Sequence, residues 1–253
     1  MSQGLAVLTG ASRGLGRALA EQLLARGDRV LALARSPAAL LVPAGANLVS
    51  WSVDLADAAP VAARLETWLQ GLDARHLASA TLINNAGVVS DLAPLSELAY
   101  DDLQNALRVG LEAPTLLTAA FLRATAGWPM PRKVVLVSSG LGRRAMAGSA
   151  SYCAAKAGLD HLARALALEE SAKPAGARVV SLAPGVIDTD MQVQLRGADS
   201  RRFPERERFM GLKANGQLDS PAQAAAKLLA YLERPDFGDP AVGDVRDAPG
   251  AAR

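Results

Sequence analysis

The sequence contains a single cysteine, Cys153, and only two histidines, His76 and His161. One cysteine cannot form a disulfide within the chain, and these few separated side chains do not supply the ligand clusters that bind zinc. We therefore expect no metal site and a reducing compartment, the cytoplasm. The N-terminus lacks a basic signal segment, and no apolar run reaches the ~18 residues of a membrane span, so we also expect a soluble chain without membrane contact.

No block of one charge sign occurs along the chain. Its 27 lysines and arginines and 25 acidic residues leave a formal charge of +2, and the two signs alternate closely, as in Arg206, Glu207 and Arg208. A nucleic-acid-binding surface would gather basic residues on one face. The pattern therefore argues against a nucleic-acid partner.

Aromatic residues are also few, at 4% of the chain, whereas half of all residues are apolar. This composition suits helices packed on a sheet, and 253 residues fit one α/β domain spanning 1–253. Short Val, Leu and Ile runs alternate with longer helical patterns, which indicates a parallel sheet with helical crossovers. The predicted strands are 4–9, 29–35, 47–53, 80–84, 132–138, 177–183 and 241–245. The predicted helices are 14–26, 57–70, 99–124, 152–172 and 221–233.

Two segments interrupt this alternation. Pro114 lies inside the predicted helix 99–124 and marks a kink or a boundary between two helices. Residues 190–219 are polar, contain three glycines and precede the last predicted helix. We interpret this insertion as a mobile lid over a substrate rather than as a second domain.

A glycine-rich turn follows the first predicted strand. It runs from Thr9 to Gly16, with the spacing Gly-x-x-x-Gly-x-Gly, and a helical pattern begins at once. Glycines let a backbone approach a pyrophosphate, whose charge is stabilised by the free N–H groups at the start of a helix. The turn therefore predicts a dinucleotide-binding loop that includes Gly10, Ser12, Arg13, Gly14, Leu15 and Gly16.

The end of the second predicted strand indicates which dinucleotide binds. An NAD enzyme places an acid there to bind the ribose 2′-hydroxyl, but this chain has Arg35 followed by Ser36. A cation at this position attracts a 2′-phosphate, and Arg13 supplies a second donor. The sequence therefore predicts NADP(H) as the cofactor, unless Arg35 only ends a strand in solvent.

Three polar residues form a candidate catalytic group. Ser139 follows the strand 132–138, Tyr152 begins a helix, and Lys156 lies four residues after Tyr152 on the same helix face. A nearby cation stabilises a phenolate and lowers the tyrosine pKa from its ordinary value of about 10. Ser139 is then expected to bind the substrate oxygen while Tyr152 donates or removes the proton. A Tyr-x-x-x-Lys pair alone is common on helices, so the surrounding motifs decide its meaning.

These motifs occur in the order of the short-chain dehydrogenase/reductase family, which the chain resembles over nearly its whole length. The resemblance rests on the loop from Thr9 to Gly16, the stretch 84–87 (Asn-Asn-Ala-Gly), Ser139, the stretch 152–156, and Pro184 with Gly185. It implies a Rossmann-like, doubly wound parallel sheet of about seven strands, a carbonyl substrate, and a homodimer or homotetramer. The further cofactor contacts that it implies are Asp54, Leu55, Asn85, Ala86, Gly87, Tyr152, Lys156, Pro184, Gly185, Ile187 and Thr189.

The chain departs from this family at one catalytic position. The family usually carries an asparagine in the long helix before the serine strand, and Gly110 stands at that place. That asparagine is thought to hold a water that relays protons to the lysine. We expect Gly110 to slow turnover, or a water to fill the space. Asn105 could substitute for the missing asparagine, but it lies five residues before Gly110 and so does not share its helix face.

The C-terminal half resembles the sepiapterin reductases and the related bacterial benzil reductases most. Matching segments include 152–156, 183–192, 212–218 and 242–245. In sepiapterin reductases an aspartate near the C-terminus binds the pterin, and Asp244 falls at the matching place. Asp244 is therefore either a substrate anchor or a solvated residue at the end of a strand.

The leading hypothesis is an NADPH-dependent reductase of a carbonyl compound, such as an aromatic or vicinal diketone or the side-chain ketone of a pterin. One alternative is an NADP-binding regulatory protein with little catalysis, for which Gly110 is the only positive feature. Another is a 3-oxoacyl thioester reductase. Retention of Ser139, Tyr152 and Lys156 argues against a simple binder, because binding alone does not require these three side chains.

Overall fold

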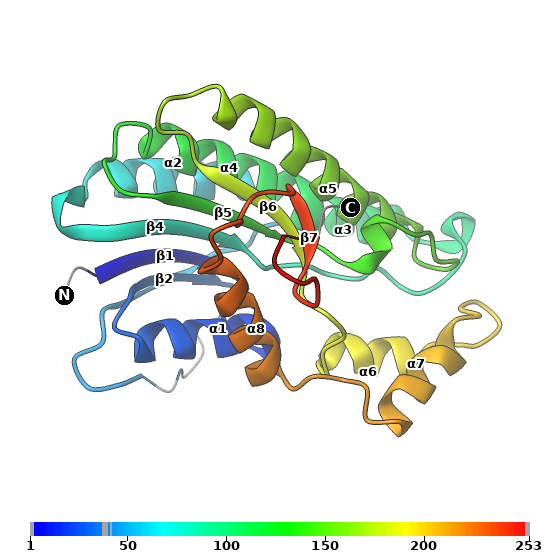
Figure 1. Cartoon of the computed structure of the whole chain (residues 1–253). Coiled ribbons are helices and arrows are strands. Elements are labelled where there is room, and N and C mark those ends of the chain that lie inside the picture. The colour runs from blue at the N-terminus through cyan, green and yellow to red at the C-terminus, as the bar shows by residue number, and fades with distance from the viewer. Residues whose placement is uncertain (1–2, 37–39, 41, 251–253) are drawn as a thin grey trace.

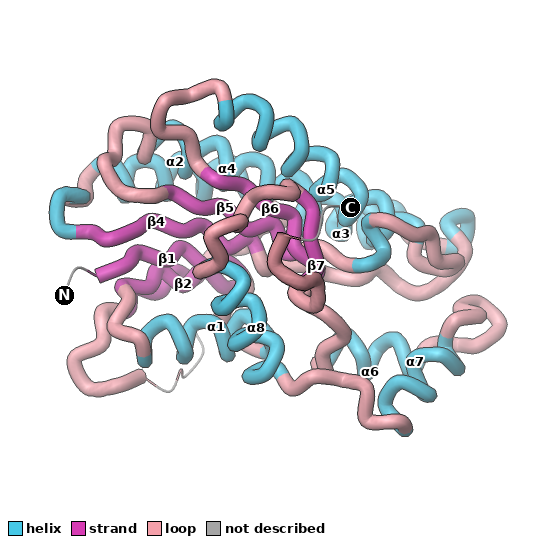
Figure 2. Tube along the Cα trace, viewed as in Figure 1, coloured by secondary structure: helices cyan, strands magenta, loops and turns pink. Residues whose placement is uncertain are grey.

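Short apolar runs form one parallel sheet in the computed structural model, which describes residues 3–36, 40 and 42–250 (Figures 1 and 2). The described residues give a seven-stranded sheet in the order β3-β2-β1-β4-β5-β6-β7, and every neighbouring pair is parallel. The strands are β1 Gln3–Thr9, β2 Arg29–Ala34, β3 Leu48–Ser52, β4 Leu77–Asn84, β5 Arg132–Val137, β6 Arg178–Ala183 and β7 Val242–Asp244. The chain order reverses between β1 and β4, which is where doubly wound sheets bind ligands.

Helices cover both faces of this sheet (Figure 1). The α-helices are α1 Gly14–Ala25, α2 Ala58–Gln70, α3 Tyr100–Leu107, α4 Ala113–Ala124, α5 Ala150–Ser171, α6 Asp190–Gly197, α7 Arg206–Ala214 and α8 Pro221–Leu232. One buried cluster joins the sheet to α2, α4 and α5 through residues such as Leu65, Phe121 and Leu159. A second cluster joins the other face to α1 and α8 through Leu19 and Leu228. This arrangement confirms the predicted Rossmann-like fold class.

The predicted helix 99–124 is interrupted in its middle. A π-helical turn, Arg108–Glu112, separates α3 from α4, and the Ala113 N–H donates to the Arg108 carbonyl. Pro114 lies in the first turn of α4, where its missing N–H is tolerated. The predicted boundary near Pro114 is therefore present, but the chain passes it through a widened helical turn rather than a loop.

The remaining elements follow the predicted bounds closely. The largest shift is β4, which begins at Leu77 rather than at residue 80 because it pairs with the first residues of β1. The predicted lid region, 190–219, contains α6 and α7, which extend away from the sheet in Figure 1. No helix among the described residues is long and apolar enough to cross a membrane.

Candidate active site

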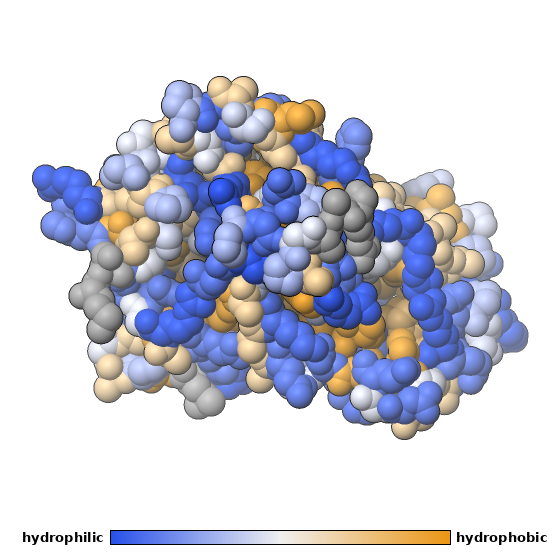
Figure 3. All heavy atoms as spheres, viewed as in Figure 1, coloured by the Kyte–Doolittle hydropathy of each residue, from blue (hydrophilic) through white to orange (hydrophobic). Residues whose placement is uncertain are grey.

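A cleft of about 700 Å³ opens at the carboxyl ends of the strands. The residues that line it come mainly from the segments that follow β1 to β6, from the start of α5, and from α6 and α7, with further residues from α3, the π-helical turn and the end of β7. Apolar side chains are visible in the hollow beside the α6–α7 segment in Figure 3. Every predicted site residue lines this cleft except Ser36, which follows Arg35 but lies outside the lining.

The glycine-rich loop is built for close backbone approach. Gly10 and Gly14 have φ values of +71° and +52°, a region that residues with a side chain rarely adopt. A Cβ atom on Gly16 would lie 2.1 Å from the Gly10 carbonyl oxygen, so only glycine fits there. Helix α1 begins directly after the loop, and its N-cap residue, Arg13, makes no side-chain capping bond. The N–H groups of its first turn are therefore available to a phosphate.

The segment after β4 fixes this loop from the opposite side. The Asn85 side-chain amide donates to the carbonyl oxygens of Thr9 and Gly10 at 3.0 and 3.3 Å. In return, the Thr9 hydroxyl oxygen accepts from the backbone N–H groups of Asn85 and Ala86 at 3.0 and 2.9 Å. These bonds tie together the carboxyl ends of β1 and β4, which explains why the Asn-Asn-Ala-Gly stretch is both structural and part of the cleft.

The end of the cleft beside β2 carries charged side chains. Arg35 follows β2, is exposed and has no side-chain partner among the described residues. Arg13 instead pairs with Asp190 at the start of α6, with 2.9 Å between Nη1 and Oδ2, and both side chains are about 70% exposed. Asp54 lines the cleft and accepts from the backbone N–H of Ala56. Arg35 is thus the less engaged of the two predicted phosphate donors.

The predicted catalytic residues lie together at the centre of the cleft. Ser139 follows β5, and Tyr152 and Lys156 lie one helical turn apart near the start of α5. The Lys156 Nζ donates to the Val137 carbonyl at 2.7 Å and lies 5.4 Å from the centroid of the Tyr152 ring. The strand end therefore holds the ammonium group beneath the tyrosine.

Burial controls the protonation of this group. It raises the pKa of Tyr152 to about 12, while a hydrogen bond with Ser139 acts in the opposite direction. It lowers the pKa of Lys156 to about 8, against the attraction of Asp160. The sequence-based prediction that the pKa of Tyr152 is lowered is wrong for the free chain, because desolvation of the phenolate dominates. Tyr152 consequently carries its proton at neutral pH.

An apolar chamber adjoins these three residues. Its lining consists of the cleft-facing side chains Leu141, Met146, Met191, Leu195, Phe209 and Leu212. Behind them, the same buried cluster includes Leu92 and Phe203. One buried polar group interrupts this lining. Gln192, on α6, is 6% exposed and lines the cleft, yet its side-chain oxygen has no hydrogen-bond partner among the described residues. No single-sequence signal singles out this glutamine or the chamber lining, because both arise from the placement of α6 and α7.

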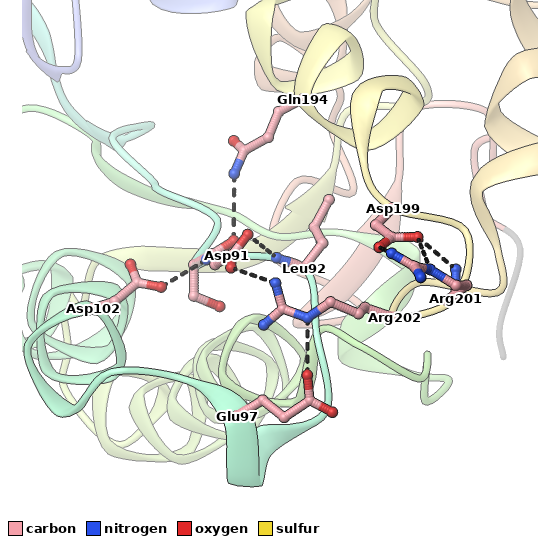
Figure 4. Close-up of polar contacts among 9 residues, drawn as sticks. Asp91, Leu92, Glu97, Asp102, Gln194, Asp199, Arg201 and Arg202 are labelled. Atoms are coloured by element: carbon pink, nitrogen blue, oxygen red, sulfur yellow. Dashed lines mark hydrogen bonds and ion pairs between the residues drawn. The ribbon is translucent and has the colours of Figure 1, made fainter.

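The α6–α7 segment is fastened across the chamber by polar contacts (Figure 4). Arg202 donates from Nε to Glu97 at 2.9 Å and from Nη1 to Asp91 at 3.1 Å. The Gln194 amide donates to the carbonyl oxygen of Ser90 at 3.3 Å. Phe203, next to Arg202, is fully buried. The segment between α6 and α7 is therefore docked on the loop after β4, and its role as a mobile lid stays a prediction.

The structure also places the two uncertain positions. Asp244 is 3% exposed and lines the cleft, but Arg246 donates to both of its oxygens, at 2.7 Å from Nε and 2.6 Å from Nη2. It is therefore not a solvated strand end.

Gly110 is buried in the π-helical turn, where an added Cβ would lie 3.1 Å from the Cβ of Ala155. Asn105, the suggested substitute, is one of the residues that line the cleft.

Comparison with known proteins agrees with this geometry. A family model for short chain dehydrogenases matches residues 4–200. A benzil reductase ((S)-benzoin forming) of Bacillus subtilis (strain 168) is 35% identical over 230 residues, which cover 91% of this chain and 93% of that protein. A sepiapterin reductase of Meriones unguiculatus is 35% identical over 256 residues, with 95% of each chain covered.

A solved structure extends the similarity to three dimensions. It is the crystal structure of a protein from Beutenbergia cavernae with bound NADP at low occupancy. It shares 27% sequence identity with this chain and gives a TM-score of 0.78, with 97% of this chain and 96% of the other covered.

Proposed function

This chain belongs to the short-chain dehydrogenase family, and we propose that it is an NADPH-dependent reductase that converts one carbonyl of an aromatic vicinal diketone to a hydroxyl group. The observation that carries this proposal is the convergence of Ser139, Tyr152 and Lys156 between a glycine-rich loop and an apolar chamber. A binding protein would not require this proton-donating group beside the chamber.

The proposed reaction divides the work between the cofactor and the chain. Bound NADPH supplies the hydride that reaches the carbonyl carbon. Ser139 donates a hydrogen bond to the carbonyl oxygen, and Tyr152 transfers its proton to that oxygen as negative charge develops there. The positive charge of Lys156 then stabilises the phenolate that remains. The product is a hydroxy ketone, and solvent later returns a proton to Tyr152.

Arg35 supports NADPH as the reduced cofactor. Its guanidinium lies at the cleft with no partner among the described residues, and no acid ends β2 to bind a ribose 2′-hydroxyl. A charge-assisted bond to a phosphate contributes about 1.5–3 kcal/mol, or roughly ten- to a hundredfold in affinity. The similar solved structure with bound NADP agrees with this assignment.

The cofactor proposal is tested by the ratio of kcat/KM for NADPH to that for NADH. We expect a clear preference for NADPH, reduced about tenfold or more in Arg35→Ala. Arg164→Ala is the matched control, since this exposed arginine on α5 does not line the cleft. Equal efficiency with both cofactors in the unaltered protein would contradict the proposal.

The chamber supports an aromatic diketone as the substrate. Its aliphatic, thioether and aromatic lining favours burial of apolar rings. The unpartnered side-chain oxygen of Gln192 is an acceptor, so it can bind the hydroxyl group of the hydroxy ketone product. The similar benzil reductase makes benzoin according to its name, which agrees with this choice. Asp244 favours a pterin as a second candidate because it lines the cleft, but a pterin would first have to displace Arg246.

The substrate is tested by following NADPH oxidation with benzil, sepiapterin and a 3-oxoacyl thioester. We expect the highest kcat/KM for benzil, with benzoin as the product. A higher value for sepiapterin would favour the pterin candidate, and a higher value for the thioester would favour a 3-oxoacyl reductase. NADPH binding without turnover of any carbonyl would favour a regulatory NADP-binding protein instead.

The proposal extends to the state of the enzyme in the cell. A reductase using NADPH suits the cytoplasm, and we propose that the chain works there as a homodimer or homotetramer, without nucleic-acid or membrane partners. Sedimentation of the purified protein tests the assembly, since a monomer that retains full activity would contradict it.

A further inference from the structure

A buried carboxylate lies directly behind the catalytic residues. Asp160, on α5, is 2% exposed. Its Oδ1 accepts hydrogen bonds from the hydroxyls of Ser138 and Ser181 at 2.7 and 2.6 Å. Its Oδ2 accepts from the Nε of Arg143 at 3.1 Å. Every oxygen of this charged group is thus bonded, as burial of a charge requires.

The three hydrogen-bond partners of Asp160 come from three different segments of the chain. Ser138 directly follows β5 and immediately precedes Ser139, whereas Ser181 lies within β6. Arg143 follows the 3₁₀ turn Gly140–Gly142, and its Nη2 also donates to the carbonyl oxygen of Gly243 in β7 at 2.9 Å. One carboxylate therefore links α5 to β5 and β6 directly, and to β7 through a single arginine.

The turn after Ser139 lies directly on α5 at this point. An added Cβ on Gly142 would lie 2.8 Å from Asp160 Oδ2 and 2.9 Å from the carbonyl oxygen of Lys156. Asp160 is one helical turn beyond Lys156, so the same stretch of α5 contacts the serine loop and carries the lysine. Movement of the carboxylate would therefore displace the loop that carries Ser139 relative to that helix.

We infer that Asp160 is a positioning residue, which holds the Ser139 loop against α5 through Ser138 and Arg143 and acts on Lys156 by its negative charge. This role rests on the proposed function for its effect on turnover. Its effect on Lys156 is independent of any substrate.

Few titratable groups act on the Lys156 ammonium. Tyr152 lies one turn before it on α5, and Asp160 lies one turn after it. From β5 the lysine meets the Val137 carbonyl, and on the side of the segment after β4 an added Cβ on Gly87 would lie 3.6 Å from its Nζ. Neither of these groups titrates. Asp160 raises the pKa of Lys156 against the larger effect of burial, which leaves it near 8. Removing this negative charge should therefore lower that pKa further.

Glu170 provides a matched control on the same helix. It is also 2% exposed, and it pairs with Lys173 and accepts from the Ala177 N–H at 2.8 Å. It lies near the C-terminal end of α5, away from the cleft lining. Glu170→Gln therefore removes an equally buried charge without touching the serine loop or Lys156.

The test compares Asp160→Asn with Glu170→Gln. We expect Asp160→Asn to reduce kcat for benzil by about ten- to a hundredfold, since small displacements of reacting groups have such effects. The alkaline limb of its pH profile should move below the value near 8 expected from Lys156. Glu170→Gln should change only the melting temperature. An unmoved limb in soundly folded Asp160→Asn would overturn the inference.

A second variant, and a direct measurement of the Lys156 pKa, keep the inference testable if Asp160→Asn does not fold or has no activity. Arg143→Gln keeps the Asp160 charge but removes the cation that competes with Lys156 for it, so the pKa of Lys156 should rise. Lys156 is one of five lysines, and its titration is measurable by NMR with isotope-labelled lysine, assigned with Lys156→Arg. Opposite shifts in the two variants are expected. An unshifted Lys156 midpoint would refute the role of Asp160 even without activity, whereas absent turnover in the unaltered protein would contradict only the proposed function.

Discussion

Gly110 offers a prediction that the structure makes quantitative. The π-helical turn presses its backbone onto α5, so a Cβ at Gly110 would lie 3.1 Å from the Cβ of Ala155, against about 3.5–4.0 Å for an ordinary carbon contact. We assign this crowding a cost of about 1 kcal/mol. Replacing glycine in a helix by alanine gains about 1 kcal/mol. The two effects offset each other, so Gly110→Ala should leave the melting temperature within about 4 °C of the unaltered protein.

A double-mutant cycle with Ala155→Gly separates the two contributions. Ala155→Gly removes the opposing methyl group, so the added side chain at position 110 no longer meets it. We expect a coupling free energy of about 1 kcal/mol between the two positions, measured by chemical denaturation. Coupling near zero would mean that the helices adjust freely and that crowding does not keep glycine at position 110.

Activity measurements on the same variants address the missing amide. Gly110→Asn and Gly110→Ala share the crowded Cβ and differ only in the amide group. If proton relay limits turnover, Gly110→Asn should exceed Gly110→Ala in kcat for NADPH-dependent benzil reduction, most clearly in the Ala155→Gly background. Equal kcat values for the two variants in both backgrounds would show that no relay depends on this position.

Two further predictions test the ends of the cleft. Gly16→Ala should abolish NADPH binding measured by fluorescence titration, because the added Cβ would lie 2.1 Å from the Gly10 carbonyl oxygen. The control is Gly211→Ala, which has open space around the added Cβ. This variant should bind NADPH normally and gain about 0.5–1 kcal/mol in helix stability. Asp244→Ala should leave KM for benzil within about twofold of the unaltered value and raise KM only for sepiapterin, because a carboxylate binds an amino-pyrimidine and not a diketone. A large rise in KM for benzil would place Asp244 in the diketone site.

The sheet and the catalytic side chains are predictable because they depend on local patterns. Apolar runs and a Gly-rich turn locate β1 and α1, and the i, i+4 spacing brings Tyr152 and Lys156 to one helix face. The parallel sheet then collects the strand ends at one edge, which places Ser139 near them. None of these steps requires knowledge of distant contacts.

The unpredicted features all depend on contacts between distant segments. A glycine at position 110 does not by itself predict a π-helical turn, because that turn depends on packing against α5. The engagement of Asp244 by Arg246 and the docking of Arg202 on the loop after β4 depend on side-chain directions that spacing does not fix. The predicted direction of the shift in the Tyr152 pKa was also wrong, because the burial of this side chain depends on the whole cleft.

The most direct test of the central claim compares the unaltered protein with Tyr152→Phe in benzil reduction by NADPH. The phenylalanine ring preserves the packing but removes the proton donor, so kcat should fall at least about a hundredfold while the Kd of NADPH changes little. Product analysis should give benzoin in an amount equal to the NADPH oxidised by the unaltered protein. A Tyr152→Phe variant that reduces benzil at nearly the unaltered rate would contradict the account.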